Sequence, residues 1–295
     1  MQSQSSLVRI DTAIGAVGVT RSGGGLPVLF WPSVFMPSDM FSPVISALGA
    51  DIDAILIDPP GQGESAPLNR TITLSECADA IADIAAALKL DQVVLVGNSW
   101  GGMVAIALAE KYPDLCRGVA LMNTSARPAT LWDKIYYGSL VPILRLAGFF
   151  GPFPAMAVRS FLGKTSRKTR NDLIDLIKQR LGEIDRRSAA NTALSILIGR
   201  ASQVDKLSSV QCPAIVIGGD EDGIFPPDHS RQLADGIPSA ELIMLQNIGH
   251  FAPLEAPTAM AAYLDPFLQG LQAEPYRGES SDPRRMQTKQ IGEAS

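Results

Sequence analysis

Residues 93–102 read VVLVGNSWGG, an apolar run of four followed by a turn rich in glycine. The run has the length and composition of a strand that is buried on both faces of a parallel sheet. Residues from Ser99 to Lys111 then favour a helix. The stretch therefore predicts a strand, a sharp turn and a helix in immediate succession.

The turn has the pattern G-x-S-x-G, formed by Gly97, Ser99 and Gly101. Between a buried strand and a helix, this pattern is typical of a nucleophile elbow, in which a strained turn lifts a serine hydroxyl out of the sheet. Glycine is needed at both ends because neighbouring chains pass too closely for a Cβ. The amides at the helix start favour an oxyanion there. A phosphate-binding loop is the alternative, but this turn has neither G-x-G-x-x-G nor a Gly-Lys-Ser/Thr ending.

Elsewhere, short apolar runs rich in β-branched residues alternate with longer helical patterns. This alternation indicates an α/β fold with a mostly parallel, eight-stranded sheet and helices on both faces. Thr73 and Glu76 have the spacing of a capping box, which marks the start of one helix. The expected strands are Leu7–Thr12, Ala16–Arg21, Val28–Trp31, Ala54–Ile57, Val93–Val96, Val119–Met122, Ala214–Ile217 and Leu242–Leu245.

Residues 128–208 break the alternation, because they carry helical patterns and no convincing strand. An all-helical insertion between two strands of a parallel sheet is most simply a cap over one edge of that sheet. We therefore divide the chain into a core, residues 1–127 and 209–271, and a helical cap, residues 128–208. The polar residues 272–295 are expected to form a disordered tail.

The chain has 295 residues, a formal net charge of -5 and a pI near 5.1. This acidity argues against nucleic acid as a partner, because phosphate binding requires a basic surface. The charge is unevenly distributed, since residues 130–208 hold 13 Lys and Arg against 6 Asp and Glu, a balance of +7. Two interpretations remain open: a solvated helical face, or a surface that attracts an anionic substrate or a membrane.

Cys77, Cys116 and Cys212 have neither metal-ligand nor redox spacing, which indicates free thiols in a reducing compartment. The N-terminus lacks a basic start followed by an apolar run, so no signal peptide is expected. The most apolar stretch, Leu140 to Phe153, is interrupted by Arg145 and is too short for a bilayer, which requires about 20 apolar residues. We expect a cytoplasmic protein without a transmembrane segment.

A serine nucleophile needs a base, which at neutral pH is usually histidine. The sequence has two histidines. His229 begins a polar helix and is expected at the surface, whereas His250 follows the last expected strand, at the sheet edge where parallel sheets carry their sites. The third group should be a carboxylate beyond another strand, and Asp220, Glu221 and Asp222 all qualify.

Four motifs resemble those of the α/β-hydrolase superfamily and follow one another in the family's order. The likeness covers nearly the whole chain apart from the tail. One of the four is the serine turn described above. Residues 58–65 (DPPGQGES) look like the family's D-x-x-G-x-G-x-S loop, and residues 248–257 (IGHFAPLEAP) look like its histidine signature.

The family's acid motif, with an aspartate three residues after a glycine, is similar to the segment from Gly219 to Pro226. This alignment favours Asp222 over Asp220. The resemblance implies a catalytic triad of nucleophile, acid and histidine in the family's chain order. The residues concerned are Ser99, Asp222 and His250.

The chain departs from the family at the end of the third expected strand, where His-Gly is usual and Pro32-Ser33 stands here. Enol-lactonase-like members carry Asn-Ser at this place. The resemblance implies an oxyanion hole formed by the backbone amides of Val34 and Trp100, with Ser33 replacing Val34 if the register shifts by one. Pro32 has no N–H and cannot serve. Trp31 and Trp100 either narrow this hole or pack behind it.

The resemblance implies a serine hydrolase that cleaves a small-molecule carboxylic ester or lactone through an acyl-enzyme, with neither metal nor organic cofactor. An apolar acyl or aromatic group is expected in the substrate, because aromatic residues gather early in the cap, either as its core or as a pocket lining. These residues are Trp132, Tyr136, Tyr137, Phe149, Phe150 and Phe153.

Two alternatives remain open. One is hydrolysis of a carbon–carbon bond, as in meta-cleavage product hydrolases, although those enzymes usually have tryptophan where this chain has Phe251, and a Gly-rich oxyanion loop where it has Pro32-Ser33. The other is a ligand-binding protein that keeps a hydrolase fold without turnover, which the apparently complete triad disfavours.

Overall fold

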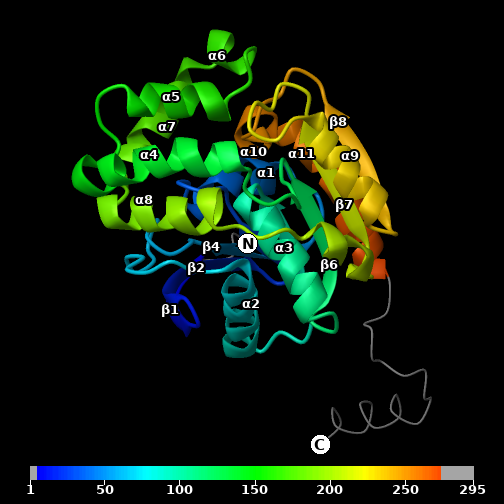
Figure 1. The fold of residues 1–295 in the computed structure, drawn as a ribbon. Coiled ribbons are helices and arrows are strands. Elements are labelled where there is room, and N and C mark those ends of the chain that lie inside the picture. The colour runs from blue at the N-terminus through cyan, green and yellow to red at the C-terminus, as the bar shows by residue number, and fades with distance from the viewer. Residues whose placement is uncertain (1–4, 274–295) are drawn as a thin grey trace, which may run out of the picture.

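A computed structural model describes residues 5–273, in which eight strands form one sheet (Figure 1). The strand order is β1-β2-β4-β3-β5-β6-β7-β8. Strand β2 pairs antiparallel with β1 and with β4, and all other neighbours are parallel. The strands are β1 Ser6–Thr12, β2 Gly15–Gly23, β3 Leu26–Trp31, β4 Ile52–Ile57, β5 Val93–Asn98, β6 Cys116–Met122, β7 Ala214–Gly219 and β8 Ala240–Leu245. The predicted fold class is confirmed.

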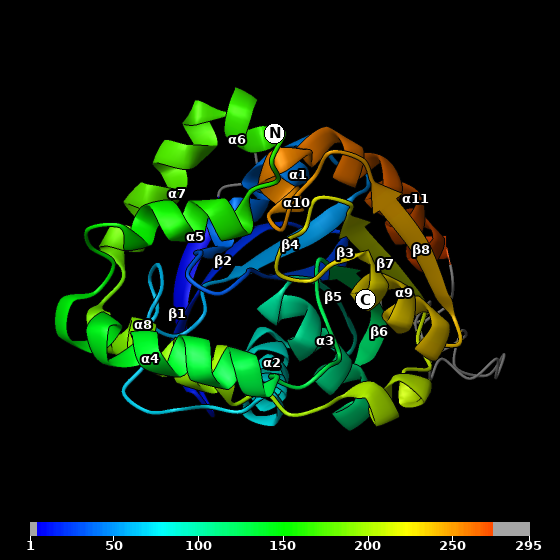
Figure 2. The ribbon, with the colours of Figure 1, turned by 45° about the horizontal axis from the view of Figure 1, so that its top comes forward.

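Helices cover both faces of the sheet, as Figure 2 shows: α2, α3 and α9 lie on one face, and α1 and α11 on the other. Every residue of β4, β5, β6 and β7 is buried in consequence, which explains why their sequences are mainly apolar. The bounds are α1 Ser42–Ala47, α2 Leu74–Leu88, α3 Trp100–Lys111, α9 Pro227–Gly236, α10 Ala252–Glu255 and α11 Pro257–Ala273.

The ends of these helices follow local signals. Thr73 and Glu76 form the predicted capping box at the start of α2, each side chain accepting a hydrogen bond from the other's backbone amide. Helix α11 extends to Ala273, two residues into the segment expected as a tail. Residues 274–295, the rest of that segment, lie outside the described residues.

Between β6 and β7 the described chain forms helices and no strand. We call residues 131–198 the helical segment. Together with residues of the core it encloses a cavity at the carboxyl ends of the strands. No helix within residues 5–273 is long and apolar enough to cross a bilayer. The segment consists of α4 Leu131–Ala147, α5 Phe153–Phe161, α6 Ser166–Thr169, α7 Asn171–Glu183, α8 Arg186–Thr192 and a π-helical stretch, Ala193–Ile198.

Candidate active site

Ser99 connects β5 to α3 in a strained backbone conformation, with φ 55° and ψ −108°. Residues other than glycine rarely adopt a positive φ, so the surroundings must hold the serine in place. Its amide donates a hydrogen bond of 2.8 Å to the carbonyl of Met122 in β6. Its carbonyl accepts one of 2.6 Å from the hydroxyl of Thr124. The turn thus has the geometry of the predicted elbow.

The glycines on either side of Ser99 lie where a Cβ cannot fit. A Cβ on Gly97 would lie 2.1 Å from the carbonyl carbon of Gly101. A Cβ on Gly101 would lie 2.0 Å from the carbonyl oxygen of Trp31, at the end of β3. The close passage of neighbouring chains therefore explains both glycines, as predicted.

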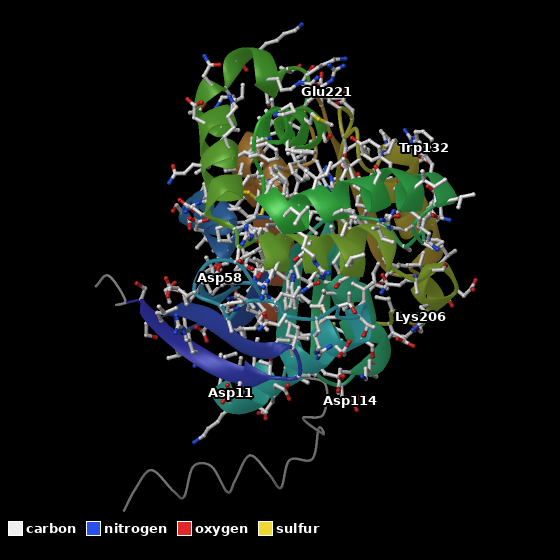
Figure 3. The ribbon with its side chains drawn as sticks, turned by 60° about the vertical axis from the view of Figure 1, so that its left-hand side comes forward. Asp11, Asp58, Asp114, Trp132, Lys206 and Glu221 are labelled. Atoms are coloured by element: carbon white, nitrogen blue, oxygen red, sulfur yellow. The ribbon has the colours of Figure 1, made fainter. Side chains whose placement is uncertain are left out.

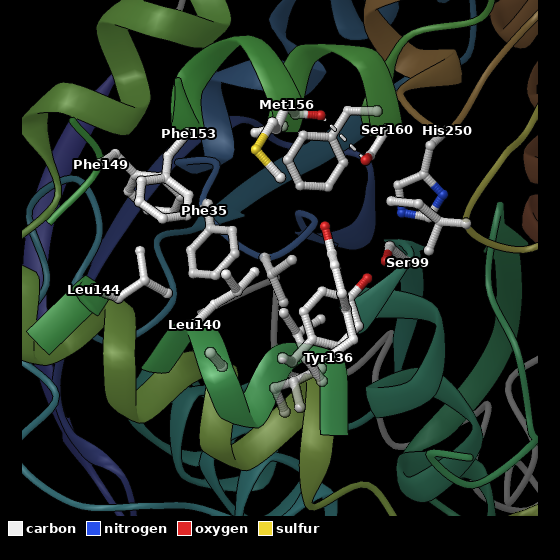
Figure 4. Close-up of a pocket in the computed structure, with 18 of the residues that line it drawn as sticks. Phe35, Ser99, Tyr136, Leu140, Leu144, Phe149, Phe153, Met156, Ser160 and His250 are labelled. Carbon is white, nitrogen blue, oxygen red and sulfur yellow. Dashed lines mark hydrogen bonds between the residues drawn. The ribbon is translucent and has the colours of Figure 1, made fainter. Parts of the chain in front are cut away.

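His250 and Asp222 form a buried pair, in which His250 Nδ1 lies 2.9 Å from Asp222 Oδ2. A carboxylate only accepts hydrogen bonds, so in the neutral imidazole Nδ1 carries the proton and the lone pair lies on Nε2. Nε2 has no hydrogen-bond partner among the described residues. His250 and Ser99 line the same cavity and lie close together at one end of it (Figure 4). The fold thus brings the imidazole ring of His250 and the hydroxyl of Ser99 to the same end of the cavity.

The carboxylate of Asp222 accepts three further hydrogen bonds. The amides of Ile224 and Phe225 donate to Oδ1 over 2.8 and 3.0 Å, and Asn123 Nδ2 donates to Oδ2 over 3.1 Å. Such bonds fix the orientation of the carboxylate. Asp222 can therefore hold the imidazole ring and stabilise a positive charge on it.

The hydrogen-bond partners distinguish Asp222 from Asp220 and Glu221, the two carboxylates before it in the sequence. Asp220 is exposed, and its Oδ1 lies 3.4 Å from the amide of Ile248. Glu221 accepts hydrogen bonds from the amide and the hydroxyl of Thr165, of 2.7 and 2.9 Å. Asp222 alone of the three contacts His250.

His229 is half-buried, and the prediction of a surface histidine was wrong. Its Nδ1 lies 2.7 Å from the hydroxyl of Ser125, and its ring packs beside Phe225. Burial and the nearby charge of Arg127 lower the pKa of His229. His229 is not among the residues that line the cavity with Ser99.

Two buried asparagines, which were not predicted from the sequence, position the loop that carries His250. We call this loop, residues 246–251, the histidine loop. Asn98 Nδ2 donates to the carbonyl of His250 over 3.1 Å. Asn123, itself at φ 46°, donates to the carbonyl of Gly249 over 2.9 Å as well as to Asp222. Both are polar residues at the carboxyl ends of buried strands, β5 and β6, and that pattern was the available signal.

Glu255 connects the histidine loop to the helical segment. Its Oε2 accepts hydrogen bonds of 3.0 Å from the amides of Gly163 and Gly249. Its Oε1 accepts one of 3.2 Å from the amide of Phe251. Burial raises the pKa of this carboxyl group, and the three amides oppose the shift. The amide of His250 also donates to the carbonyl of Phe161, over 2.8 Å, so this junction is held at several points.

The loop after β3 supplies the candidate oxyanion donor. Val34 lines the cavity and Ser33 does not, which favours Val34 of the two predicted positions. The amide of Val34 donates none of the hydrogen bonds found among the described residues. The amide of Trp100 is the first of α3, where no acceptor exists within the helix. Trp31 and Trp100 are fully buried, pack edge to face at 5.4 Å and lie behind the cavity wall.

The cavity has a volume of about 100 Å³, and its wall is mainly apolar. Figure 4 shows Ser99 and His250 at one end and Leu144 and Phe149 toward the other. Of the six aromatic residues predicted as core or lining, Trp132 and Phe150 are exposed instead. The other four line the cavity, namely Tyr136, Tyr137, Phe149 and Phe153.

Comparison with known proteins agrees with the fold described above. A family model described as the alpha/beta hydrolase fold matches residues 27–257. The chain belongs to this family.

A poly(3-hydroxyalkanoate) depolymerase of Ectopseudomonas oleovorans is 26% identical over 254 residues, which cover 82% of this chain and 84% of that protein. A thermophilic esterase from Thermogutta terrifontis superimposes with a TM-score of 0.84 at 26% identity, covering 91% of this chain and all of the esterase. The enol-lactonase from Burkholderia xenovorans shares the fold, with a TM-score of 0.78 at 22% identity, covering 86% and 96% of the two chains. Esterases and other hydrolases are thus among the similar proteins.

Proposed function

We propose that this protein is a serine hydrolase that cleaves a carboxylic ester or lactone with an apolar acyl or aromatic group. The observation that carries the proposal is the hydrogen bond of 2.9 Å between His250 Nδ1 and Asp222, which leaves Nε2 free at the cavity end shared with Ser99. Hydrogen bonds of catalytic groups are often loose before substrate binds, so the free Nε2 is consistent with a base that acts on Ser99.

The reaction proceeds in two steps. His250 takes the proton of Ser99 as its oxygen attacks the substrate carbonyl, and Asp222 stabilises the imidazolium. The amides of Val34 and Trp100 hold the oxyanion, and His250 then protonates the leaving alcohol. A water molecule, activated by His250 in the same way, releases the acid from the serine. One oxyanion donor in such a site contributes about 3 kcal/mol to the transition state.

Support for an apolar substrate comes from the cavity wall. Among the described residues, Arg200 is the only Lys, Arg, Asp or Glu in the wall, and this side chain is paired with Asp133 at 3.0 Å. The esterase described above is named for the cleavage of esters, which favours an ester or lactone over a carbon–carbon bond. A cytoplasmic location belongs to the same proposal, since Cys77, Cys116 and Cys212 have neither metal-ligand nor redox spacing in the sequence.

A Ser99→Ala variant tests the proposal. We expect turnover of p-nitrophenyl esters and γ-lactones to fall by at least about 10⁴-fold, because the nucleophile is lost. Circular dichroism and the unfolding midpoint should match the wild type. Ester turnover that survives the substitution contradicts the proposal, and cleavage of a dienone alone points to a carbon–carbon hydrolase.

A further inference from the structure

Helix α4 exposes an apolar stripe to solvent. Eleven large apolar side chains are exposed in the described part of the chain, and eight of them lie within residues 131–156. Trp132 and Leu146 are 72% and 76% exposed, and Figure 3 shows Trp132 on α4 at the edge of the molecule. We call these eight side chains the stripe: Leu131, Trp132, Ile135, Tyr136, Ile143, Leu146, Phe150 and Met156.

The stripe makes α4 apolar on two sides. Val141 and Leu144 are buried in the protein, and Tyr137 and Leu140 line the cavity, while Trp132 and the other exposed residues follow at helical spacing on the outer side. A helix that is apolar all round is typical of an environment that covers it completely. Single exposed apolar residues are ordinary, but a contiguous set of this size marks an interaction surface.

Basic side chains surround the stripe. Lys134 and Arg145 are exposed on α4, and Arg159 is exposed on α5. Arg186 is exposed and donates a hydrogen bond of 3.0 Å to the carbonyl of Leu146. Residues 130–208 carry a balance of +7 in a chain of net charge -5. A second copy of the chain would bring this positive charge against itself, whereas an anionic surface attracts it.

The mouth of the cavity lies beside the same surface. Among the residues that line the cavity, three are exposed: Tyr136 on α4, and Met156 and Ser160 on α5. Tyr136 and Met156 also belong to the exposed apolar set. An apolar molecule that leaves a surface docked there would therefore enter the cavity without crossing bulk water.

We propose that the outer side of α4 and the start of α5 dock on an anionic phospholipid surface, with the cavity mouth directed toward the lipid. Trp132, Leu146 and Phe150 insert at the level of the headgroups, and the surrounding Lys and Arg residues contact the phosphates. Docking does not depend on the proposed chemistry, so a Ser99→Ala variant is expected to bind lipid as the wild type does.

Tryptophan fluorescence gives a direct test, because Trp31 and Trp100 are fully buried and Trp132 is the exposed tryptophan of the three. Vesicles with about one third phosphatidylglycerol should shift the emission of the protein to shorter wavelength. Vesicles of phosphatidylcholine alone should give a much smaller change, and the spectrum of Trp132→Ala should not respond. Co-sedimentation of the full chain with the same vesicles measures its partition coefficient.

Substitutions distinguish the apolar contribution to docking from the electrostatic one. The double variant Trp132→Ala/Leu146→Ala should lower partition at least about tenfold, since each side chain loses apolar burial. Lys134→Gln and Arg159→Gln should each lower it about fivefold on anionic vesicles alone. Tyr263→Ala, which removes an aromatic ring that is 40% exposed on α11, away from the stripe, should leave partition unchanged.

Three results would overturn the proposal. The first is the absence of binding to anionic vesicles at low ionic strength, and the second is binding that the double variant leaves unchanged. The third is a dimer in solution that the double variant converts to monomers, because the stripe would then be an interface between copies of this chain.

Discussion

The conformation of Ser99 depends on its neighbours more than on the serine itself. A φ of 55° is unfavourable for any residue with a side chain. The hydrogen bond from its amide to Met122 fixes the turn to β6, and Gly97 and Gly101 let the crossing chains approach. A strained residue persists only where its surroundings leave it no alternative. Substitutions at these glycines should therefore affect both stability and turnover.

Gly101→Ala is expected to lower the free energy of unfolding by about 2 kcal/mol or more, because its Cβ would meet the backbone of Trp31 at 2.0 Å. Ester turnover should be lost with it. Gly138→Ala is the matched control, since Gly138 lies inside α4 with open space around it and should gain up to about 1 kcal/mol. Urea titration measures both, and an unchanged midpoint for Gly101→Ala would contradict the close approach.

The two histidines should differ in their effect on activity and on stability. His250→Gln is expected to abolish ester turnover, whereas His229→Gln should retain it, because His229 does not line the cavity. The pKa of His229 is lowered from its ordinary value of 6.5, so the unfolded chain takes up this proton more readily than the folded protein.

The sign of the pH dependence follows from this difference. The stability due to neutral His229 is fully present above pH 6.5 and is lost as the pH falls below that value toward the lowered pKa. Between pH 7.5 and 5.5, wild type should therefore lose more free energy of unfolding than His229→Gln. Equal losses in urea titrations at the two pH values would argue against a depressed pKa.

At the scale of the elements, the stability of the junction between α5 and the histidine loop should depend strongly on the side chain of Glu255. Glu255→Ala leaves the buried amides of Gly163 and Gly249 without their acceptor, at a cost of about 1–3 kcal/mol for each. We expect a loss of about 3 kcal/mol or more in unfolding free energy and a lower kcat. Glu241→Ala, at an exposed position in β8, should change stability by less than about 0.5 kcal/mol.

All eight strands could be located from the sequence, and the parallel ones most directly, because buried parallel strands are short apolar runs between turn residues. It also placed Ser99 at the turn after β5, since that motif is local. The choice among Asp220, Glu221 and Asp222 rested on a resemblance, and the structure separates them by their partners. The positions of their side chains depend on loops that meet only in the folded chain.

The roles of Asn98 and Asn123 show where such reasoning ends. Asn98 contacts the carbonyl of a residue 152 positions later, and Asn123 contacts one 126 positions later. No periodicity or spacing encodes such pairs. The half-burial of His229 escaped prediction for the same reason, because Phe225, Ser125 and Arg127 surround it from two separate loops.

Considered as a whole, the molecule builds its cavity from both the core and the helical segment, so neither part determines substrate size alone. Phe35 of the core packs edge to face on Phe149 of the helical segment, with ring centroids 5.0 Å apart. This pair lies away from Ser99 in the view of Figure 4. Under the proposed function, we therefore expect this pair to limit the length of an acyl chain attached to Ser99.

For p-nitrophenyl esters, kcat/KM should rise up to about fourfold per added methylene until the chain reaches this pair. Phe149→Ala should move the optimum to acyl chains at least two carbons longer, because it opens that end of the cavity. The neighbouring Phe150 is 53% exposed and does not line the cavity, so Phe150→Ala should keep the wild-type optimum. Identical profiles for all three proteins would show that the acyl group lies elsewhere.

The contact between Gly163 and Gly249 constrains how this architecture can be recombined. A Cβ on Gly249 would lie 2.0 Å from the amide nitrogen of Gly163, so the two backbones touch without any intervening side chain. In a chimera that exchanges the helical segment of one relative for that of another, the junctions between the two sequences must therefore lie away from this contact. Grafts that cut between Phe161 and Thr165 would displace the imidazole ring along with the transplanted helices.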